Sequence, residues 1–302
     1  MSHYLITGGA GFIGTNLAKA LVKQGHAVRV IDNYSAGRFP DRVIEGVEYC
    51  EGDIRNRADL DKAVQGIDGV FHTAAVPRVP YSIEHPLETN EHNVTGTLQV
   101  LLAAKEAGVQ RVVYSASQSA YGDQPTMPLV ETMPIKPLSP YALQKFIGEE
   151  YCRLFSELYG LETVSLRYFN IYGPLMNPEG GYALVIGKFL RQRKNNEPMT
   201  LTGDGEYFRD FTHVNDAVAA NIKAMTSSKV GKGEVLNIGF GKSHSVNYLA
   251  QLIGGETTYI PERAGDIRKG EADTTKARTL LDWEPTIPLE EGIAELKKMW
   301  GI

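Results

Sequence analysis

Short apolar segments alternate with amphipathic ones along the first two thirds of the chain. Runs of β-branched and aromatic residues, bounded by turn formers, predict strands at 3–7, 27–31, 47–50, 69–72, 111–116 and 163–167. Helical patterns separate most of them, and the longest carries an apolar stripe of Leu143, Phe146, Ile147, Tyr151, Leu154, Phe155 and Leu158. This alternation predicts an α/β fold, a doubly wound parallel sheet with helices on both faces.

The pattern changes after Asn170, where loop-forming pairs cluster: Gly173-Pro174, Asn177-Pro178 and Gly180-Gly181. We therefore predict a sheet domain over 1–170 and a smaller C-terminal α/β lobe that binds substrate over 171–302. The apolar run at 235–238, followed by Gly239, predicts a strand that rejoins the first domain.

Composition removes several classes of function. With 42% hydrophobic and 22% charged residues the chain has the composition of a folded protein rather than a disordered one. Its net charge of -5 does not favour binding to nucleic acid, which is a polyanion. No apolar run approaches the roughly 18 residues of a membrane span, and no signal-peptide pattern precedes the first strand, so we expect a cytoplasmic protein. Cys50 and Cys152 lack ligand spacing, so we expect no metal site.

A glycine-rich turn between the first strand and the first helix predicts a dinucleotide site. The run Thr7-Gly8-Gly9-Ala10-Gly11-Phe12-Ile13-Gly14 contains GxGxxG and GxxGxxG. Glycine allows a sharp turn, close approach of the backbone to a pyrophosphate and tight packing, and the helix N-terminus offers free N–H groups. On this motif alone, a glycine-rich turn without a ligand remains the alternative.

Asp32, at the end of the second strand, extends this site. Its carboxylate would accept hydrogen bonds from the adenosine ribose and repel a 2'-phosphate, so NAD is favoured over NADP. Arg38 is the one nearby cation that would weaken this preference. The further cofactor contacts that we expect are Asn33, Ser35, Gly37, Asp53, Ile54, Thr73, Ala74 and Ala75.

Tyr141 and Lys145 predict a reactive pair at the start of the helix that Ser139-Pro140 introduces. They are one helical turn apart, so their side chains share a face. A tyrosine needs its pKa lowered by about three units to be half ionised at neutral pH, and one cation supplies about one to three. Lys145 together with the positive nicotinamide of NAD+ would make Tyr141 a general base; a surface pair is the alternative.

A serine-rich strand end supplies a third candidate, Ser117, in the run Ser115-Ala116-Ser117-Gln118-Ser119-Ala120-Tyr121-Gly122. Ligands of open α/β sheets bind beyond the carboxyl ends of the strands, so Ser117 can face both a substrate and Tyr141. A simple turn is the alternative. The three motifs in one chain favour catalysis.

As a set these motifs resemble the extended short-chain dehydrogenase/reductases of the NAD-dependent epimerase/dehydratase family, and more narrowly the UDP-hexose 4-epimerases. The resemblance includes Asn93 and the run Arg167-Tyr168-Phe169-Asn170. It implies a Rossmann domain that binds NAD, with Asn93 structural or near the cofactor and Phe169 at the nicotinamide end. It also implies a catalytic triad of Ser117, Tyr141 and Lys145, the last two also touching the cofactor.

The second lobe resembles the part of that family that holds a nucleotide sugar. By this resemblance Asn170 lies at the diphosphate, Arg209 and Arg263 bind it, and Asp266 binds a ribose. Guanidinium groups suit phosphate oxygens, although either arginine would also serve in a surface ion pair. The family has a gatekeeper at the position of Gly270, where a bulky side chain disfavours 2-acetamido sugars, so the glycine here implies that N-acetylated substrates are accepted.

The resemblance also separates related reactions. Dehydratases of the family carry Asp-Glu, and UDP-glucuronate decarboxylases a Glu, in the two positions that Gln118 and Ser119 occupy here. We therefore predict a UDP-hexose 4-epimerase that acts on UDP-GlcNAc/UDP-GalNAc, UDP-glucose/UDP-galactose or both, through a transient 4-keto sugar. A UDP-glucuronate 4-epimerase, a decarboxylase or dehydratase of the same fold, and a non-catalytic NAD-binding protein are the alternatives. The family further implies a homodimer through helices at 94–102 and 146–158.

Overall fold

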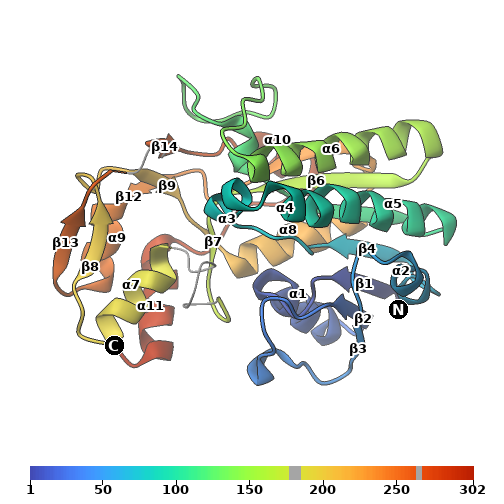
Figure 1. Cartoon of the computed structure of the whole chain (residues 1–302), viewed down its shortest axis with the longest axis horizontal. Helices are drawn as coiled ribbons and strands as arrows, with labels where there is room; N and C mark the ends of the chain where they lie inside the picture. The colour runs from blue at the N-terminus through green and yellow to red at the C-terminus, as the bar shows by residue number, and fades with distance from the viewer. Residues whose placement is uncertain (177–184, 263–266) are drawn as a thin grey trace.

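A seven-stranded parallel sheet forms the centre of the computed structural model, which describes residues 1–176, 185–262 and 267–302 (Figure 1). The strand order is β3-β2-β1-β4-β5-β6-β11. The bounds are β1 (His3–Thr7), β2 (Ala27–Asp32), β3 (Val47–Glu51), β4 (Gly69–His72), β5 (Arg111–Ser117), β6 (Glu162–Tyr168) and β11 (Lys232–Ile238). The predicted strands are thus confirmed, including the late one that rejoins the sheet.

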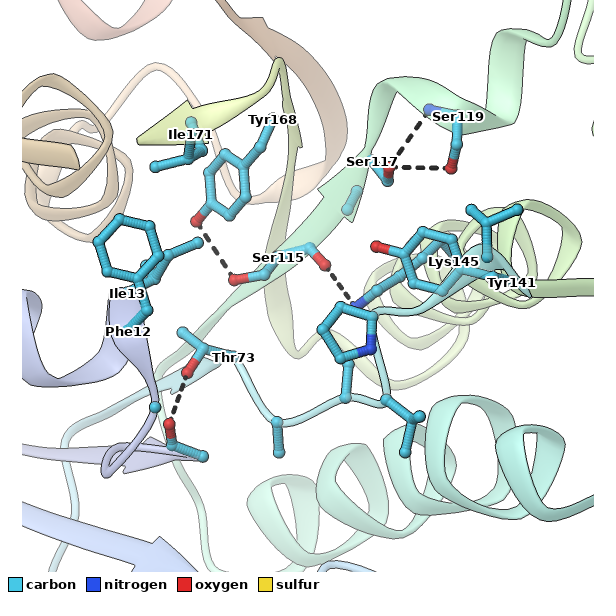
Figure 2. A pocket seen from close by; sticks show the side chains of 18 of the residues that line it. Phe12, Ile13, Thr73, Ser115, Ser117, Ser119, Tyr141, Lys145, Tyr168 and Ile171 are labelled. Carbon is cyan, nitrogen blue, oxygen red and sulfur yellow. Dashed lines mark hydrogen bonds between the residues drawn. The ribbon is translucent and has the colours of Figure 1, made fainter. Parts of the chain in front are cut away.

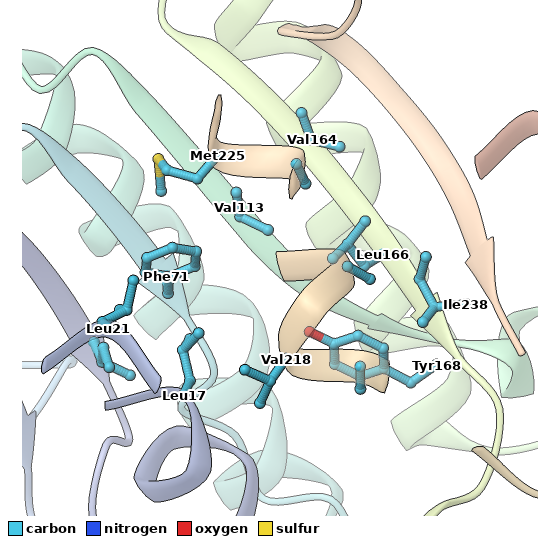
Figure 3. Packing of buried hydrophobic residues seen from close by; sticks show 14 of the residues in the cluster. Leu17, Leu21, Phe71, Val113, Val164, Leu166, Tyr168, Val218, Met225 and Ile238 are labelled. Carbon is cyan, nitrogen blue, oxygen red and sulfur yellow. The ribbon is translucent and has the colours of Figure 1, made fainter. Parts of the chain in front are cut away.

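Helices cover both faces of this sheet, which confirms the doubly wound α/β fold (Figure 1). One face carries α1 (Phe12–Lys23), α8 (Val214–Thr226) and α10 (Thr275–Leu281), and the other α2 (Arg57–Ala63), α5 (Gly96–Glu106) and α6 (Pro140–Tyr159). Figure 3 shows Leu17 of α1, Phe71 of β4 and Val218 of α8 in one buried cluster. Burying each such side chain stabilises the fold by about 1.5–3 kcal/mol, so this core holds the strand ends in place.

A smaller lobe lies beside the carboxyl ends of the strands (Figure 1). Its helices α7 (Val185–Lys194), α9 (Val246–Ile253) and α11 (Leu289–Trp300) share a buried core with the strand pair β8 (Met199–Thr202) and β13 (Thr257–Ile260). The strands β12 (Ser243–Ser245), β9 (Phe208–Asp210) and β14 (Lys269–Gly270) form a three-stranded sheet, and β7 (Ile171–Tyr172) pairs with β10 (Thr212–His213). Between these elements the chain returns to the large sheet through α8, β11 and α10.

The ends of α6 follow from its sequence and place the reactive pair. Ser139 Oγ accepts a hydrogen bond from the N–H of Ala142, and Pro140 occupies the first turn. Gly160, with a left-handed φ of 70°, ends the helix. In the middle of α6, Gly148 packs so closely on the hydroxyl of Tyr114 in β5 that a Cβ there would overlap it. This close contact brings the start of α6 to the end of β5.

Most of the apolar stripe predicted on this helix does not face the sheet, although Phe155 is buried in the core beside it. The residues of α6 buried against its neighbours include Ala142, Lys145 and Glu149, whereas Leu143 and Leu158 are 46% and 66% exposed. The periodicity therefore identified the helix correctly but not most of the face that packs inward, because small, polar and charged side chains occupy much of that face. No helix in the described part of the chain is long and apolar enough to cross a membrane.

Candidate active site

A cavity of about 880 Å³ lies at the carboxyl ends of β1, β2, β4, β5 and β6 and reaches the smaller lobe at Arg209 and Gly270. A second cavity of about 310 Å³ lies within that lobe, and both cavities are lined by Asn170 and Arg209. The predicted site therefore runs from the glycine turn, past the end of β5, into the smaller lobe. The described residues contain no group of three or more His, Cys, Asp or Glu side chains that could hold a metal ion.

The glycine turn accepts only glycine at two of its positions. Gly8 has a φ of 69°, and a Cβ on it would lie 2.6 Å from Ala74 Cα. A Cβ on Gly14 would lie 2.6 Å from the carbonyl oxygen of Gly8. No described side chain caps the start of α1, and Phe12 and Ile13 line the cavity. The first N–H groups of this helix are thus available to an anionic group.

Asp32 lies at the end of β2 and lines the same cavity. Its carboxylate accepts hydrogen bonds from the N–H groups of Ala10 (3.0 Å) and Tyr34 (2.8 Å). Burial raises the pKa of Asp32, and these two bonds act against the increase. Each carboxylate oxygen keeps acceptor capacity for a ribose hydroxyl. Arg38 is ion-paired with Glu51 at 2.6 Å and is absent from the described cavity lining.

Most of the predicted cofactor residues line this cavity. They come from the glycine turn, the end of β2, the loops after β3 and β4, and the start of α6: Gly8, Gly11, Phe12, Ile13, Gly14, Asp32, Asn33, Ser35, Gly37, Ile54, Thr73, Ala74, Ala75, Tyr141 and Lys145. Three predicted cofactor residues do not line it: Asp53, Asn93 and Phe169.

Each of these three has an evident structural role. Asp53 forms an ion pair with Arg55 at 2.8 Å, which holds the pKa of its carboxyl well below the usual range. Asn93 accepts from the N–H of Val76 at 2.8 Å and so fixes the loop after β4. Phe169 is fully buried in a small apolar cluster. The roles of all three toward the cofactor stay predictions.

Lys145 projects from α6 into the buried end of the cavity. Its Nζ donates to the carbonyl oxygen of Ser115 at 2.8 Å (Figure 2). Burial lowers the pKa of Lys145 to about 8, and the nearby carboxylate of Glu149 acts in the opposite direction. Both oxygens of Glu149 accept hydrogen bonds from Arg167, at 2.9 and 2.6 Å. The lysine is therefore held beside a buried ion pair.

Tyr141 lies one turn before Lys145 and faces the end of β5, where Ser117 is located (Figure 2). Burial raises the pKa of Tyr141, and a hydrogen bond with Ser117 lowers it by less. Lys145 alone therefore does not make Tyr141 a base at neutral pH. The positive charge of an oxidised nicotinamide, which the sequence argument also required, would act in the needed direction.

The substrate end brings together three of the predicted residues. Asn170, Arg209 and Gly270 all line the main cavity. Asn170 donates to the carbonyl oxygen of Asp210 at 2.8 Å, and Gly270 on β14 pairs in register with Arg209 on β9. The other two predicted substrate residues, Arg263 and Asp266, lie outside the described residues.

Among the residues of the cavity lining without a site role assigned from the sequence, Ser119, Gln118 and Arg42 contact predicted site residues or the glycine turn. Ser119 donates to Ser117 Oγ through both its N–H (3.2 Å) and its Oγ (2.8 Å). Gln118 Oε1 lies 3.0 Å from the position of a Cβ on Gly270. Arg42 donates to backbone carbonyls of the glycine turn and of the loop after β7. The serine-rich motif signals the first two, whereas Arg42 lies in a loop without a motif.

The sequence profile of the NAD dependent epimerase/dehydratase family matches residues 4–239. The chain belongs to this family. It is 36% identical to a UDP-glucose 4-epimerase of Mycolicibacterium smegmatis, over 96% of both chains. It is also 36% identical to the solved UDP-N-acetylglucosamine 4-epimerase of Methanobrevibacter ruminantium M1 in complex with UDP-N-acetylmuramic acid, with a TM-score of 0.93 over 99% and 98% of the two chains. UDP-glucuronic acid decarboxylase 1 of Xenopus tropicalis is 33% identical over 96% of this chain and 70% of its own.

Family membership confirms NAD as the cofactor. The described residues fit it, because the glycine turn has no room for a Cβ at Gly8 or Gly14 and Asp32 carries a negative charge where a 2'-phosphate would lie. Relatives with different reactions have similar identities to this chain. The choice of reaction therefore depends on the residues at the reactive end.

Proposed function

We propose that this protein is an NAD-dependent UDP-hexose 4-epimerase. The observation that carries the proposal is the lack of a carboxylate at the reactive end. Among the described residues that line the main cavity, Asp32 is the only carboxylic acid, and it lies at the dinucleotide end. Gln118 and Ser119 occupy the positions where an acid would serve elimination or decarboxylation. Inversion at C4 requires only a base for the hydroxyl and a hydride acceptor.

Three described side chains, those of Tyr141, Ser117 and Lys145, handle the proton of the C4 hydroxyl. NAD, when bound, supplies reversible hydride acceptance at C4. Tyr141 removes the proton of the C4 hydroxyl and later returns it, Ser117 hydrogen-bonds the same oxygen, and Lys145 stabilises the phenolate. Oxidation at C4 gives a planar ketone, so its reduction on the opposite face produces the epimer. The reaction then involves no net oxidation.

We place the diphosphate of the substrate at the junction of the two cavities. Arg209 lines both of them, and its guanidinium suits phosphate oxygens. In this placement the hexose points toward Ser117 and Tyr141. The nucleoside then occupies the smaller cavity, beside Thr200 and Thr202.

Gly270 supports the acceptance of 2-acetamido sugars as well as plain hexoses. It contributes no side chain to the cavity, and Gln118 lies opposite it. A carboxamide can both donate to and accept from an acetamido group. Turnover of UDP-galactose without turnover of UDP-GlcNAc or UDP-GalNAc would contradict this part of the proposal.

A panel of UDP-sugars tests the proposed function. The NAD-loaded protein is incubated with the glucose, galactose, GlcNAc, GalNAc and glucuronate derivatives, and proton NMR reports the configuration at C4. We expect interconversion of one or both hexose pairs, with no release of CO2 or NADH. Inversion of UDP-glucuronate alone would make the protein a UDP-glucuronate 4-epimerase, and CO2 release would make it a decarboxylase. A lack of turnover on every sugar would favour a non-catalytic NAD-binding protein.

We also propose a homodimer formed through α5 and α6. Part of the apolar stripe of α6 points away from the sheet and leaves Leu143 and Leu158 exposed, together with the ring of Tyr159. Burial of such a stripe against a second copy would remove it from water. Leu98 and Leu102 of α5 are partly buried beside it.

A further inference from the structure

Ser119 occupies both acceptor positions of the Ser117 hydroxyl. The backbone N–H of Ser119 donates to Ser117 Oγ at 3.2 Å, and its own Oγ donates to the same atom at 2.8 Å (Figure 2). A serine hydroxyl has two acceptor lone pairs and one donor hydrogen. With both lone pairs engaged, the hydrogen of Ser117 is left to donate to a third group.

We propose that Ser119 is a positioning residue that directs the single hydroxyl hydrogen of Ser117 toward the phenolic oxygen of Tyr141. This inference rests on the proposed 4-epimerase function, in which Tyr141 is the base. Ser119 itself exchanges no proton and forms no covalent bond. Its effect reaches Tyr141 only through Ser117.

The direction of the hydrogen bond decides which form of Tyr141 is favoured. A serine that donates to the tyrosine oxygen stabilises the phenolate, whereas a serine that accepts from it stabilises the neutral phenol. A serine without fixed partners can do either. The contact with Ser117 is the one that lowers the pKa of Tyr141 against the effect of burial. By holding Ser117 in the donor orientation, Ser119 therefore favours the active form of the base.

Few other charges near Tyr141 can take over this effect. On α6, Lys145 donates to the Ser115 carbonyl. Behind β4 and β5, burial lowers the pKa of His72 to about 3 and raises that of Tyr114, so both are neutral. Further along α6, Glu149 is bound to Arg167 and Cys152 is a buried thiol. The remaining ionisable groups of the described cavity lining are Asp32, Arg42, His92, Tyr168, Arg209 and Lys269.

A purely structural role for Ser119 predicts a different behaviour. Ser117 is the N-cap of the short helix η3 (Gln118–Tyr121), and its Oγ accepts from the backbone N–H of Ser119. Alanine at position 119 would keep this backbone bond and remove only the bond between the two hydroxyls. The substitution Ser119→Ala therefore separates a helix-starting role from an effect on Tyr141.

The test is an NMR titration of Tyr141 in the NAD-loaded protein, with tyrosine labelled at the ring carbon that bears the hydroxyl and with Tyr141→Phe to assign the signal. We expect Ser119→Ala to raise the pKa of Tyr141 by about one unit, and Ser117→Ala to raise it at least as much. Ser119→Thr, which keeps the hydroxyl, should restore most of the effect. Ser156→Ala is the matched control, because Ser156 on α6 donates instead to the carbonyl of Gly231.

The second readout is the pH dependence of UDP-hexose turnover. The apparent pKa of the increase in rate on the acidic side should rise by the same amount in Ser119→Ala. An unchanged pKa of Tyr141 in Ser119→Ala would overturn the proposal, whether or not Ser117→Ala changes it. If the pKa shifts as expected but no UDP-hexose is turned over, the positioning role stands and the proposed epimerase function fails. If the hexoses react but the pKa of Tyr141 does not shift, the proposed epimerase function stands and the positioning role of Ser119 fails.

Discussion

Tyr141 links the chemistry of the site to its cofactor. Burial raises the pKa of this tyrosine more than Ser117 lowers it, so in the NAD-free protein Tyr141 is a neutral phenol at physiological pH. Lys145, the nearby cation, is itself partly neutralised because burial lowers its pKa to about 8. In the proposed mechanism, the positive charge of the oxidised nicotinamide therefore lowers the pKa of Tyr141 when the cofactor is bound.

The substitution Tyr141→Phe should remove turnover and preserve cofactor binding. It removes the group that takes the C4 proton, a contribution of about 100- to 10,000-fold, and it keeps the ring that lines the cavity. UDP-hexose turnover by NMR and NAD content after denaturation are the two measurements. Activity close to that of the unmodified protein would remove Tyr141 from the role of base.

Lys145 makes the stability of the NAD-free protein depend on pH. Its pKa is about 8 when folded and 10.5 in its ordinary range. Between these values the unfolded chain binds more protons than the folded one, so stability rises with pH. Relative to Lys145→Met, the free energy of unfolding should therefore increase by up to about 3 kcal/mol from pH 8 to about 10.5. Urea denaturation at several pH values measures this free energy for both proteins. If their difference is independent of pH, the pKa of Lys145 is the same in the folded and unfolded protein.

At the scale of residues, the sequence predicted where the site lies better than what each side chain contacts. Asp53 follows a strand end as a ligand would, and its carboxylate forms an ion pair with Arg55 that the strand pattern did not indicate. Phe169 adjoins a cavity residue along the chain, yet its side chain packs among Leu129 and other apolar groups. Position along a strand specifies the end of the sheet, whereas local partners decide which side chains remain free.

The turn between β1 and α1 is the element on which cofactor binding depends. In Gly14→Ala the new Cβ would lie 2.6 Å from both the carbonyl of Gly8 and the Cα of Gly9, so the backbone must move. We expect at least a tenfold loss of NAD affinity, about 1.4 kcal/mol, and a lower melting temperature. Calorimetric titration with NAD measures the change in affinity.

Gly25→Ala provides the matched control for this prediction. Gly25 lies just after the other end of α1, where a Cβ would have no neighbour within 4 Å, and its φ is 82°. Alanine there should cost about 1 kcal/mol of stability and leave NAD affinity unchanged. If Gly14→Ala binds NAD as well as Gly25→Ala does, the turn does not approach the cofactor as proposed.

The strands of the sheet were predictable because buried parallel strands are short continuous apolar runs. The orientation of α6 was not, because its inward face carries Lys145 and Glu149, whose burial depends on Arg167 and on backbone groups distant in sequence. The close approach of Gly148 to Tyr114 is likewise a property of packing rather than of pattern. Helical periodicity reports apolar side chains, and on α6 most of these lie on the outward face.

At the scale of the whole molecule, the proposed function requires a chain with a net charge of -5 to hold two anionic ligands. Local groups make this possible: the uncapped start of α1 at one end of the cavity and Arg209 at the other. The overall charge thus argues against a polyanionic partner without arguing against phosphate. The smaller lobe completes the site because Arg209 and Gly270 both come from its three-stranded sheet.

The outward face of α6 leads to a prediction about assembly. Size-exclusion chromatography with light scattering should give the unmodified protein twice the mass of one chain. Leu143→Asp with Leu158→Asp should give the mass of one chain, because two carboxylates would then be buried in the interface. Met299→Asp, which alters a similarly exposed residue on α11, should leave the dimer intact. A monomer at all concentrations of the unmodified protein would contradict the proposal.

Reversible oxidation at C4 with inversion is tested most directly with UDP-glucose and UDP-GlcNAc deuterated at C4. After incubation with the NAD-loaded protein, NMR determines both the configuration at C4 and its deuterium content. We predict that the galactose or GalNAc epimer appears with the deuterium still at C4, because the hydrogen that leaves this carbon returns to it without exchange with water. Loss of the deuterium to solvent, or no inversion of either sugar, would contradict the account.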